Sequence, residues 1–287
     1  MDYLENLAGK AIAVVGLGYV GSHLLDLLKS REKESSIKIF GITRRNINLL
    51  SEESFDYVFN CAGNTGNFWQ QPINTVESNI QLNAFLLEKC KIAESLVTLS
   101  STRIYGFTED ANKVFDEDYS VAQHHHLMMD ALYDNAKKLM ECLLMNTPRD
   151  YKKVVIRLSN VYGDFRLRDL DDSTFLKLML RHKYKNEKFI VKQNISSTKD
   201  YIFIKDALEG ILRAGILSRN DDVYNICSGT SYSANDWAKF LDLRIEQISQ
   251  VPALYSNISN KKSQTKIGFV SKYKLEDLGQ TDVIKYE

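Results

Sequence analysis

The chain has 287 residues, of which 44% are hydrophobic, and its 37 Lys and Arg residues balance 37 Asp and Glu residues. This is enough apolar material for one large domain, or for one domain with a smaller lobe. A formally neutral chain lacks the basic surface on which non-specific nucleic-acid binding depends, so we expect no nucleic-acid partner. Its apolar runs are too short to cross a bilayer and no signal peptide is visible, so we expect no membrane association and a cytoplasmic location.

The cysteines and histidines give no sign of a metal site. Cys61, Cys90, Cys142 and Cys227 are far apart and lack metal-ligand spacing, so we expect free thiols in a reducing compartment. The three consecutive histidines at 124–126 cannot all face one ion well, and we interpret them as a loop before a helix. We therefore expect no metal.

Strand and helix patterns alternate in the first half of the chain. Strands are expected at 10–16, 37–43, 57–61, 96–100 and 154–158, and helices at 20–29, 76–91 and 130–146. The strand segments are apolar throughout, as in strands covered on both faces. The pattern predicts an α/β fold with a Rossmann-type, doubly wound parallel sheet. The stretch between the second and third strands is short, so the usual helix there is expected to be reduced.

The pattern weakens after Gly163. We expect helices at 173–181, 206–217 and 234–241, and strands at 201–204 and 223–226. The predicted organisation is a dinucleotide-binding domain over 1–163 and a smaller C-terminal substrate lobe over 164–287. Segments at about 201–226 are expected to return to the first domain.

A glycine-rich turn, GLGYVG, follows the first strand at residues 16–21. Gly16 would permit the tight turn, Gly18 would let a pyrophosphate approach the backbone, and Gly21 would allow close helix–strand packing. Tyr19 and Val20 open the helix whose N-terminal amides favour an anion. The alternative is a tight turn without a ligand.

The end of the second strand distinguishes the two nicotinamide dinucleotides. NAD-binding proteins place an acid there for the ribose hydroxyl, whereas this chain has Arg44 and Arg45. Guanidinium groups pair with a 2′-phosphate through a forked geometry. We therefore favour NADP(H) over NAD(H), and the alternative is a pair of solvated surface arginines.

A second set of residues carries acid–base chemistry. Ser100, Ser101 and Thr102 end the fourth strand, at the sheet edge where ligands bind. Tyr133 and Lys137 are spaced i, i+4, which puts phenol and ammonium on one helical face. We expect the ammonium to lower the phenol's pKa, so that Tyr133 works as a proton donor and acceptor near neutral pH. A lone YxxxK is usually a solvated helix face, so the order of the motifs carries the inference.

Taken in order, the motifs resemble the extended short-chain dehydrogenase/reductases of the nucleotide-sugar epimerase/dehydratase/reductase family. NCAG at 60–63, SSTRIYG at 100–106, RLSNVYG at 157–163, KDYIFIKD at 199–206 and YNICSGTSYS at 224–233 carry the resemblance over nearly the whole chain. The family usually has GxxGxxG, and aligning the last two glycines puts Val15 at the first glycine's place.

The resemblance implies roles for individual residues. It implies Ser101, Tyr133 and Lys137 as catalytic residues. Cys61, Ala62, Gly63 and Asn79 would line the cofactor, together with the glycine turn, Tyr133 and Lys137. Ser101, Thr102, Asn160 and Lys199 would contact substrate, with Lys199 in place of the arginine expected near a diphosphate.

The resemblance also implies the reaction. Dehydratases of this family carry acids directly after the catalytic Ser, where this chain has Thr102 and Arg103. The leading hypothesis is an NADP(H)-dependent oxidoreductase that reduces a 4-keto sugar on a nucleoside diphosphate. An NAD(P)-dependent nucleotide-sugar epimerase is the alternative, and a non-catalytic dinucleotide-sensing protein is the second alternative. A homodimer through the helices at 76–91 and 130–146 is possible by resemblance.

Several side chains near these motifs have plainer interpretations. We expect Phe68 and Trp69 to be buried aromatics, with flanking of a sugar or base as the alternative. We expect Tyr105 and Tyr162 to be packing residues. Arg103 would either face a pocket or form an ion pair.

Overall fold

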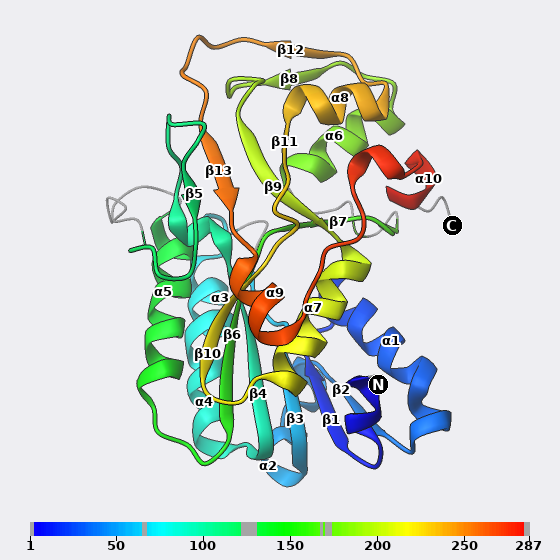
Figure 1. Ribbon diagram of the computed structural model, residues 1–287, viewed down its shortest axis with the longest axis vertical. Helices are drawn as coiled ribbons and strands as arrows, with labels where there is room; N and C mark the ends of the chain where they lie inside the picture. Colours follow the sequence, from blue (N-terminus) through cyan, green and yellow to red (C-terminus); the bar gives the residue numbers. More distant parts are fainter. Residues whose placement is uncertain (1–2, 65–67, 122–130, 167–168, 170–173, 284–287) are drawn as a thin grey trace.

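A parallel sheet of six strands forms the centre of the protein (Figure 1). The computed structural model describes residues 3–64, 68–121, 131–166, 169 and 174–283. The sheet has the order β10-β6-β4-β3-β1-β2. Its strands are β1 (Ala11–Val15), β2 (Lys38–Ile42), β3 (Ser54–Asn60), β4 (Lys91–Ser101), β6 (Lys152–Leu158) and β10 (Asp222–Ile226). This arrangement confirms the predicted α/β fold with a Rossmann-type parallel sheet.

Helices cover both faces of the sheet. They are α1 (Tyr19–Ser35), α2 (Leu49–Glu52), α4 (Leu82–Lys89), α5 (Ala131–Asn146) and α7 (Ile204–Leu217). Ile12 and Val14 of β1 belong to the same core as residues of α1 and α7, whereas Ala13 and Val15 pack with α2, α4 and α5. Successive side chains of a strand point to opposite faces, so β1 must be apolar throughout.

The strand order places a ligand crevice between β1 and β3. β1 pairs with β2 on one side and with β3 on the other, so the connections run in opposite directions from this point. Open α/β sheets bind ligands outside the carboxyl ends of the strands at such a reversal. β2 is an edge strand of the sheet, and α2 after it has only four residues, as the short connecting stretch predicted.

The helix predicted over 76–91 is divided and ends earlier. It consists of α3 (Pro72–Val76), the π-helical turn η3 (Glu77–Gln81) and α4. Pro72 suits the first turn of a helix, where its missing N–H costs nothing. Cys90 is extended and ends α4, and β4 begins at Lys91, five residues before the predicted strand.

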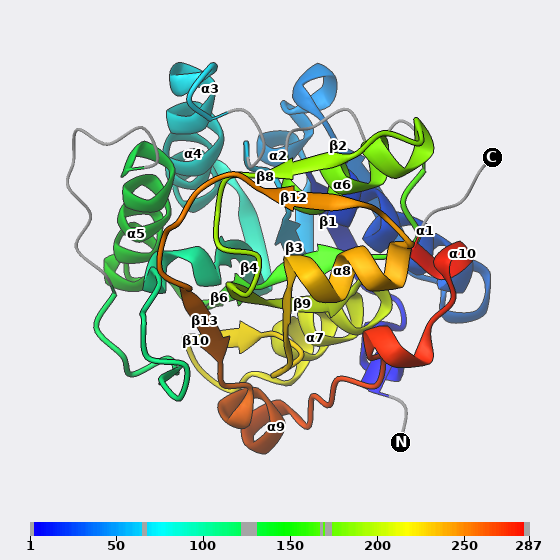
Figure 2. The ribbon, with the colours of Figure 1, turned by 90° about the horizontal axis from the view of Figure 1, so that it is seen from above.

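Much of the chain after β6, together with β5, lies above the carboxyl ends of the strands (Figures 1 and 2). β11 (Ser231–Ser233), β9 (Thr198–Phe203), β13 (Tyr255–Ile258) and β5 (Val114–Phe115) form a second sheet, and β7 (Asn160–Tyr162) pairs with β9. β8 (Phe189–Val191) pairs with β12 (Ile245–Gln247). α6 (Phe175–Tyr184), α8 (Ala234–Leu241) and α10 (Gln280–Val283) complete this layer, whereas α9 (Lys261–Ile267) packs against α7 and β10.

The C-terminal half also contributes to the large sheet. β10 pairs with β6 in parallel. α7 belongs to the hydrophobic core that also contains Ile12 and Val14 of β1. The division of the chain at Gly163 remains a prediction. Within the described part of the chain, every helix is too short or too polar to cross a membrane.

Candidate functional site

A cavity of about 740 Å³ opens where the carboxyl ends of the strands meet the second half of the chain. Residues from the glycine turn, the ends of β3 and β4, α5, β7, α6 and β9 line it. Most of the predicted site residues line it, namely Gly18, Tyr19, Val20, Cys61, Ala62, Gly63, Ser101, Thr102, Tyr133, Lys137, Asn160 and Lys199. The other predicted cofactor residues are outside its lining, namely Gly16, Gly21, Asn79, Arg44 and Arg45.

The glycine turn brings backbone close to backbone at two of its three glycines. Gly16 has a φ of +82°, and a Cβ there would lie 2.5 Å from the Cα of Ala62. A Cβ on Gly21 would collide with the carbonyl oxygen of Gly16. A Cβ on Gly18, in contrast, would meet nothing within 4 Å. Gly16 therefore makes a tight turn against Ala62, while Gly18 leaves open space where it lines the cavity.

Exchanging these glycines for alanine should separate folding from ligand binding. We expect Gly16→Ala to lower the free energy of unfolding by at least about 1–3 kcal/mol, because alanine is strained at positive φ. Gly18→Ala, the matched control, should keep wild-type stability but weaken dinucleotide binding. Urea denaturation and a dinucleotide titration measure the two effects. Equal stability of the two variants would contradict this account of the turn.

A buried polar atom beside Gly63 has the character of a ligand contact. Asn79 lies in the π-helical turn η3, and its side-chain N–H donates to the carbonyl of Thr75 at 2.8 Å. Its Oδ1 is buried and has no hydrogen-bond partner among the residues that the structure describes. A Cβ on Gly63 would lie 3.4 Å from that oxygen and 3.4 Å from the Nζ of Lys137. Buried acceptors are normally paired, so this one, like the space at Gly18, fits a bound dinucleotide.

Tyr133 and Lys137 lie on the face of α5 that is turned toward β4. Both are buried, and the Tyr133 hydroxyl is hydrogen-bonded to the side chain of Ser101. The Nζ of Lys137 lies 5.8 Å from the centre of the Tyr133 ring and donates to the carbonyl oxygen of Leu99 at 2.7 Å. The structure thus brings the three predicted catalytic residues together at one wall of the cavity.

The electrostatics differ from the sequence-based expectation. Burial raises the pKa of Tyr133 to about 12, and the hydrogen bond from Ser101 and the charge of Arg103 offset part of that rise. Burial also lowers the pKa of Lys137 to about 8. The groups that lower the pKa of Tyr133 are Ser101 and Arg103, whereas the sequence-based expectation gave that role to Lys137.

Arg103 is the residue beside Tyr133 whose role the sequence left open between a pocket and an ion pair. The structure gives it both. Its Nε donates to Asp134 at 2.8 Å, and it also lines the cavity. Phe68 is buried as expected and stacks on Tyr133 with ring centres 5.2 Å apart. Trp69, in contrast, is 40% exposed, because it lies at the cavity rim.

The predicted substrate residues Thr102, Asn160 and Lys199 also line the cavity. Thr102 is buried at the start of the 3-10 turn η4 (Thr102–Tyr105), directly after Ser101. The amide of Asn160 donates to the carbonyl of Asp200 at 2.8 Å. The ammonium of Lys199 lies 5.4 Å from the Phe107 ring centre. Lys177 of α6 also lines the cavity, and no sequence pattern predicted it, because a lysine in a short helix carries no pattern of its own.

Arg44 and Arg45 lie beyond the cavity, directly after β2. Both are exposed in the 3-10 turn η2 (Arg44–Asn46), and Arg44 donates to the side chain of Asn74 in α3. They stand at the end of the strand next to β1, where a cofactor's ribose is recognised in this type of sheet. The histidines at 124–126 lie outside the described residues.

A buried polar network lies behind the site and includes Tyr105. The carboxylate of Glu141 accepts from Ser100 and from Arg157, whose Nη2 is 2.9 Å away. Arg157 also donates to the Tyr105 hydroxyl, which in turn donates to Asn225 at 2.8 Å. The network connects β4, α5, β6 and β10, so it fixes the strand end that presents Ser101. Tyr105 and Tyr162 are fully buried, in keeping with the packing role expected for them.

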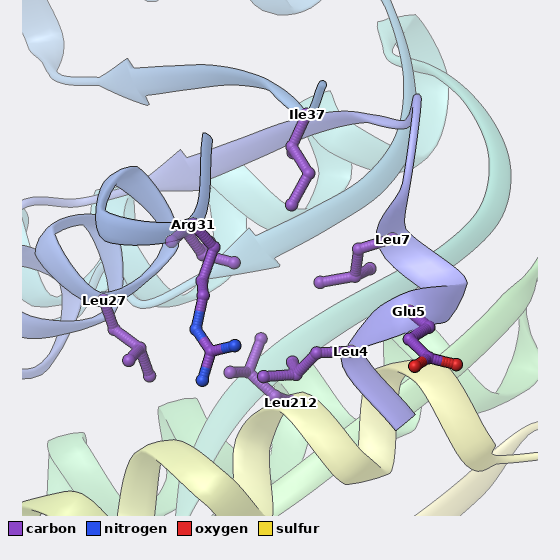
Figure 3. A pocket seen from close by; sticks show the side chains of 8 residues that line it. Leu4, Glu5, Leu7, Leu27, Arg31, Ile37 and Leu212 are labelled. Atoms are coloured by element: carbon purple, nitrogen blue, oxygen red, sulfur yellow. The ribbon is translucent and has the colours of Figure 1, made fainter. Parts of the chain in front are cut away.

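A second pocket of about 190 Å³ lies far from this site (Figure 3). It is formed by the 3-10 helix η1 (Tyr3–Leu7), the C-terminal half of α1 and α7, and Arg31 points into it between leucine side chains. Leu7 and Ile37 precede β1 and β2, so the pocket is at the amino ends of the strands. The sequence motifs all point to the opposite edge.

Comparison with known proteins gives a family and a fold. The model of a family described as the NAD dependent epimerase/dehydratase family matches residues 12–227. A dTDP-D-glucose 4,6-dehydratase of Dictyostelium discoideum is 27% identical over 273 residues, which cover 80% of this chain and 61% of that protein. The chain therefore spans less than two thirds of the length of this relative.

Two solved structures share the fold over nearly the whole chain. A UDP-glucose 4-epimerase of Thermotoga maritima with UDP-glucose has a TM-score of 0.76 at 19% identity, covering 93% of this chain and 95% of that one. RMD of Pseudomonas aeruginosa with NADPH has a TM-score of 0.74 at 19% identity, with the same two coverages of 93% and 95%. At such identities the likeness concerns the fold alone. The family match supports a nicotinamide dinucleotide cofactor.

Proposed function

Because the chain belongs to the NAD dependent epimerase/dehydratase family, we propose that it is an NADP(H)-dependent oxidoreductase that reduces a 4-keto sugar carried by a nucleoside diphosphate. The observation that carries the proposal is the common wall formed by Ser101, Tyr133 and Lys137 in a cavity that the glycine turn also lines. A bound nicotinamide supplies the hydride in such chemistry, and the protein supplies placement and proton transfer.

Tyr133, Ser101 and Lys137 have separate roles in the proposed reaction. Tyr133 would donate its proton to the substrate oxygen, and its pKa of about 12 keeps the phenol protonated before that transfer. Ser101, hydrogen-bonded to that phenol, would hold the same oxygen in line. Lys137, with a pKa of about 8 and an anchor on Leu99, would hold the cofactor's ribose. Gly18, Cys61 and Gly63 would lie against the dinucleotide, and Asn160 and Lys199 against the nucleotide sugar.

The residues after Ser101 argue against water elimination. Removal of water from a sugar needs an acid and a base besides Tyr133, and Thr102 and Arg103 hold the positions where the family's dehydratases carry acids. Thr102 is buried with a hydroxyl that does not ionise, and a guanidinium stays protonated in proteins. Simple hydride transfer, in contrast, needs only Tyr133.

An NAD-dependent epimerase is the second candidate, and one contact favours it. Arg44 is already hydrogen-bonded to Asn74, so a 2′-phosphate would have to displace that contact or rely on Arg45. Epimerases of this family retain their cofactor through the cycle, whereas a reductase must exchange it.

Cofactor binding distinguishes the two candidates. We expect NADPH to bind the purified protein more tightly than NADH, and Arg44→Gln combined with Arg45→Gln to remove about tenfold or more of that preference, because charge-assisted phosphate contacts contribute about 1.5–3 kcal/mol. Fluorescence titration measures the affinities, and Lys38→Gln on the same strand is a matched control. Tighter NADH binding would overturn the NADP(H) assignment, and co-purified NAD would put the epimerase first. A screen of 4-keto nucleotide sugars then tests the reaction.

A further inference from the structure

Arg103 lies against the catalytic tyrosine and is held there. Its guanidinium carbon is 6.0 Å from the centre of the Tyr133 ring and 5.3 Å from that of Phe68. Its Nε donates at 2.8 Å to the carboxylate of Asp134, the neighbour of Tyr133 in α5. Asp134 is buried, whereas the side chain of Arg103 is 33% exposed and lines the cavity. The ion pair with Asp134 thus holds the guanidinium against Tyr133.

The charged groups that face Tyr133 differ in the pH range over which they stay charged. In the described part of the chain these are Arg103 from η4 and Asp134 and Lys137 from α5. Lys137 loses its proton near pH 8, below the range where tyrosine ionises. Arg103 remains protonated at every pH of interest. Asp134 opposes ionisation of the phenol, but the effect of Arg103 is the larger.

We propose that Arg103, anchored by Asp134, is a positioning residue that supplies the permanent positive charge stabilising the ionised form of Tyr133. This inference rests on the proposed function, because it assigns Tyr133 the proton transfer. At the position where the family's dehydratases carry an acid that exchanges protons itself, this chain has a cation that acts through the tyrosine. Arginine at position 103 thus removes one proton-transferring acid and stabilises the ionised form of the other, Tyr133.

The test follows the ionisation of one phenol without needing a substrate. Tyr133 is replaced by 3,5-difluorotyrosine, whose phenol ionises at a lower and accessible pH, and its titration is followed by fluorine NMR. We expect Arg103→Gln to raise the titration midpoint by about one pH unit, the low end of what an adjacent opposite charge produces. Arg103→Lys, which keeps the charge, should restore most of the difference. Arg219→Gln, an exposed arginine in the connection between α7 and β10, should leave the midpoint unchanged.

The outcomes separate this inference from the proposed function. An unchanged midpoint in Arg103→Gln, or a lysine variant no better than glutamine, overturns it, even if the enzyme reduces keto sugars. Arg103→Met provides a second uncharged variant of similar length should the glutamine variant not fold. If no nucleotide sugar is turned over while the midpoint shifts as expected, the proposed function fails and the electrostatic role of Arg103 stands. An equal upward shift of the pKa in the pH profile of kcat of Arg103→Gln would show that the same ionisation controls turnover.

Discussion

Replacing Tyr133 with Phe is expected to lower kcat by about 10²–10⁴-fold, the usual contribution of a positioned proton donor. The variant loses the phenolic hydroxyl but keeps the ring that stacks on Phe68, so the protein should fold normally. Dinucleotide affinity should change little, because the glycine turn and Lys137 are untouched. Steady-state kinetics and a cofactor titration of the same preparation measure both quantities.

The same variant tests the second alternative, a non-catalytic sensor. A protein that only reports dinucleotide binding would keep its full function without the phenol. Unchanged turnover in Tyr133→Phe would therefore remove Tyr133 from the chemistry. Tyr119→Phe, a partly exposed tyrosine beside Phe115, is a matched control for loss of a phenolic hydroxyl and should leave turnover unchanged.

Breaking the buried ion pair behind the site is expected to have the largest effect on stability. Arg157→Met leaves the buried carboxylate of Glu141 without its cation, a change that typically costs about 3–5 kcal/mol. Removing both charges in Glu141→Leu with Arg157→Met should recover a large part of this loss, because no uncompensated charge remains. Urea unfolding of the two single variants and the double variant gives the coupling energy.

An exposed ion pair provides the comparison for that measurement. Lys188, directly before β8, pairs with Glu246 of β12, and half of each side chain is exposed. Lys188→Met should cost less than about 1 kcal/mol, because water already solvates both charges. A loss in Arg157→Met no larger than this would mean that the network around Glu141 does not hold the end of β4.

The large sheet was predictable because its strands are apolar on both faces. Strands buried in this way appear as uninterrupted runs, as in β1, and the glycine turn follows one of them. The short strands β7, β8, β12 and β13 were missed, since three or four residues are too few to show a period. The break at η3 also left no signal, because residues 76–91 keep a helical pattern through the π-helical turn.

The residues of the site were easier to predict than their interactions. Spacing alone put Tyr133 and Lys137 on one helix face, and motif order put Ser101 opposite them. The pair of Arg103 with Asp134, in contrast, joins residues 31 positions apart in sequence. The pKa of Lys137 depends on burial, which comes from tertiary packing. Sequence spacing therefore gave the components of the site but not which cation keeps its charge beside the phenol.

The hydroxyl of Tyr19 donates to the carbonyl of Gly163, and this contact bridges the two sides of the cavity. Tyr19 opens α1 at the glycine turn, and Gly163 follows β7, which carries Asn160. A ligand that displaces either partner perturbs the other, so dinucleotide and sugar should bind cooperatively. Such coupling is reciprocal: the dinucleotide changes the affinity for the sugar by the same factor as the sugar changes the affinity for the dinucleotide.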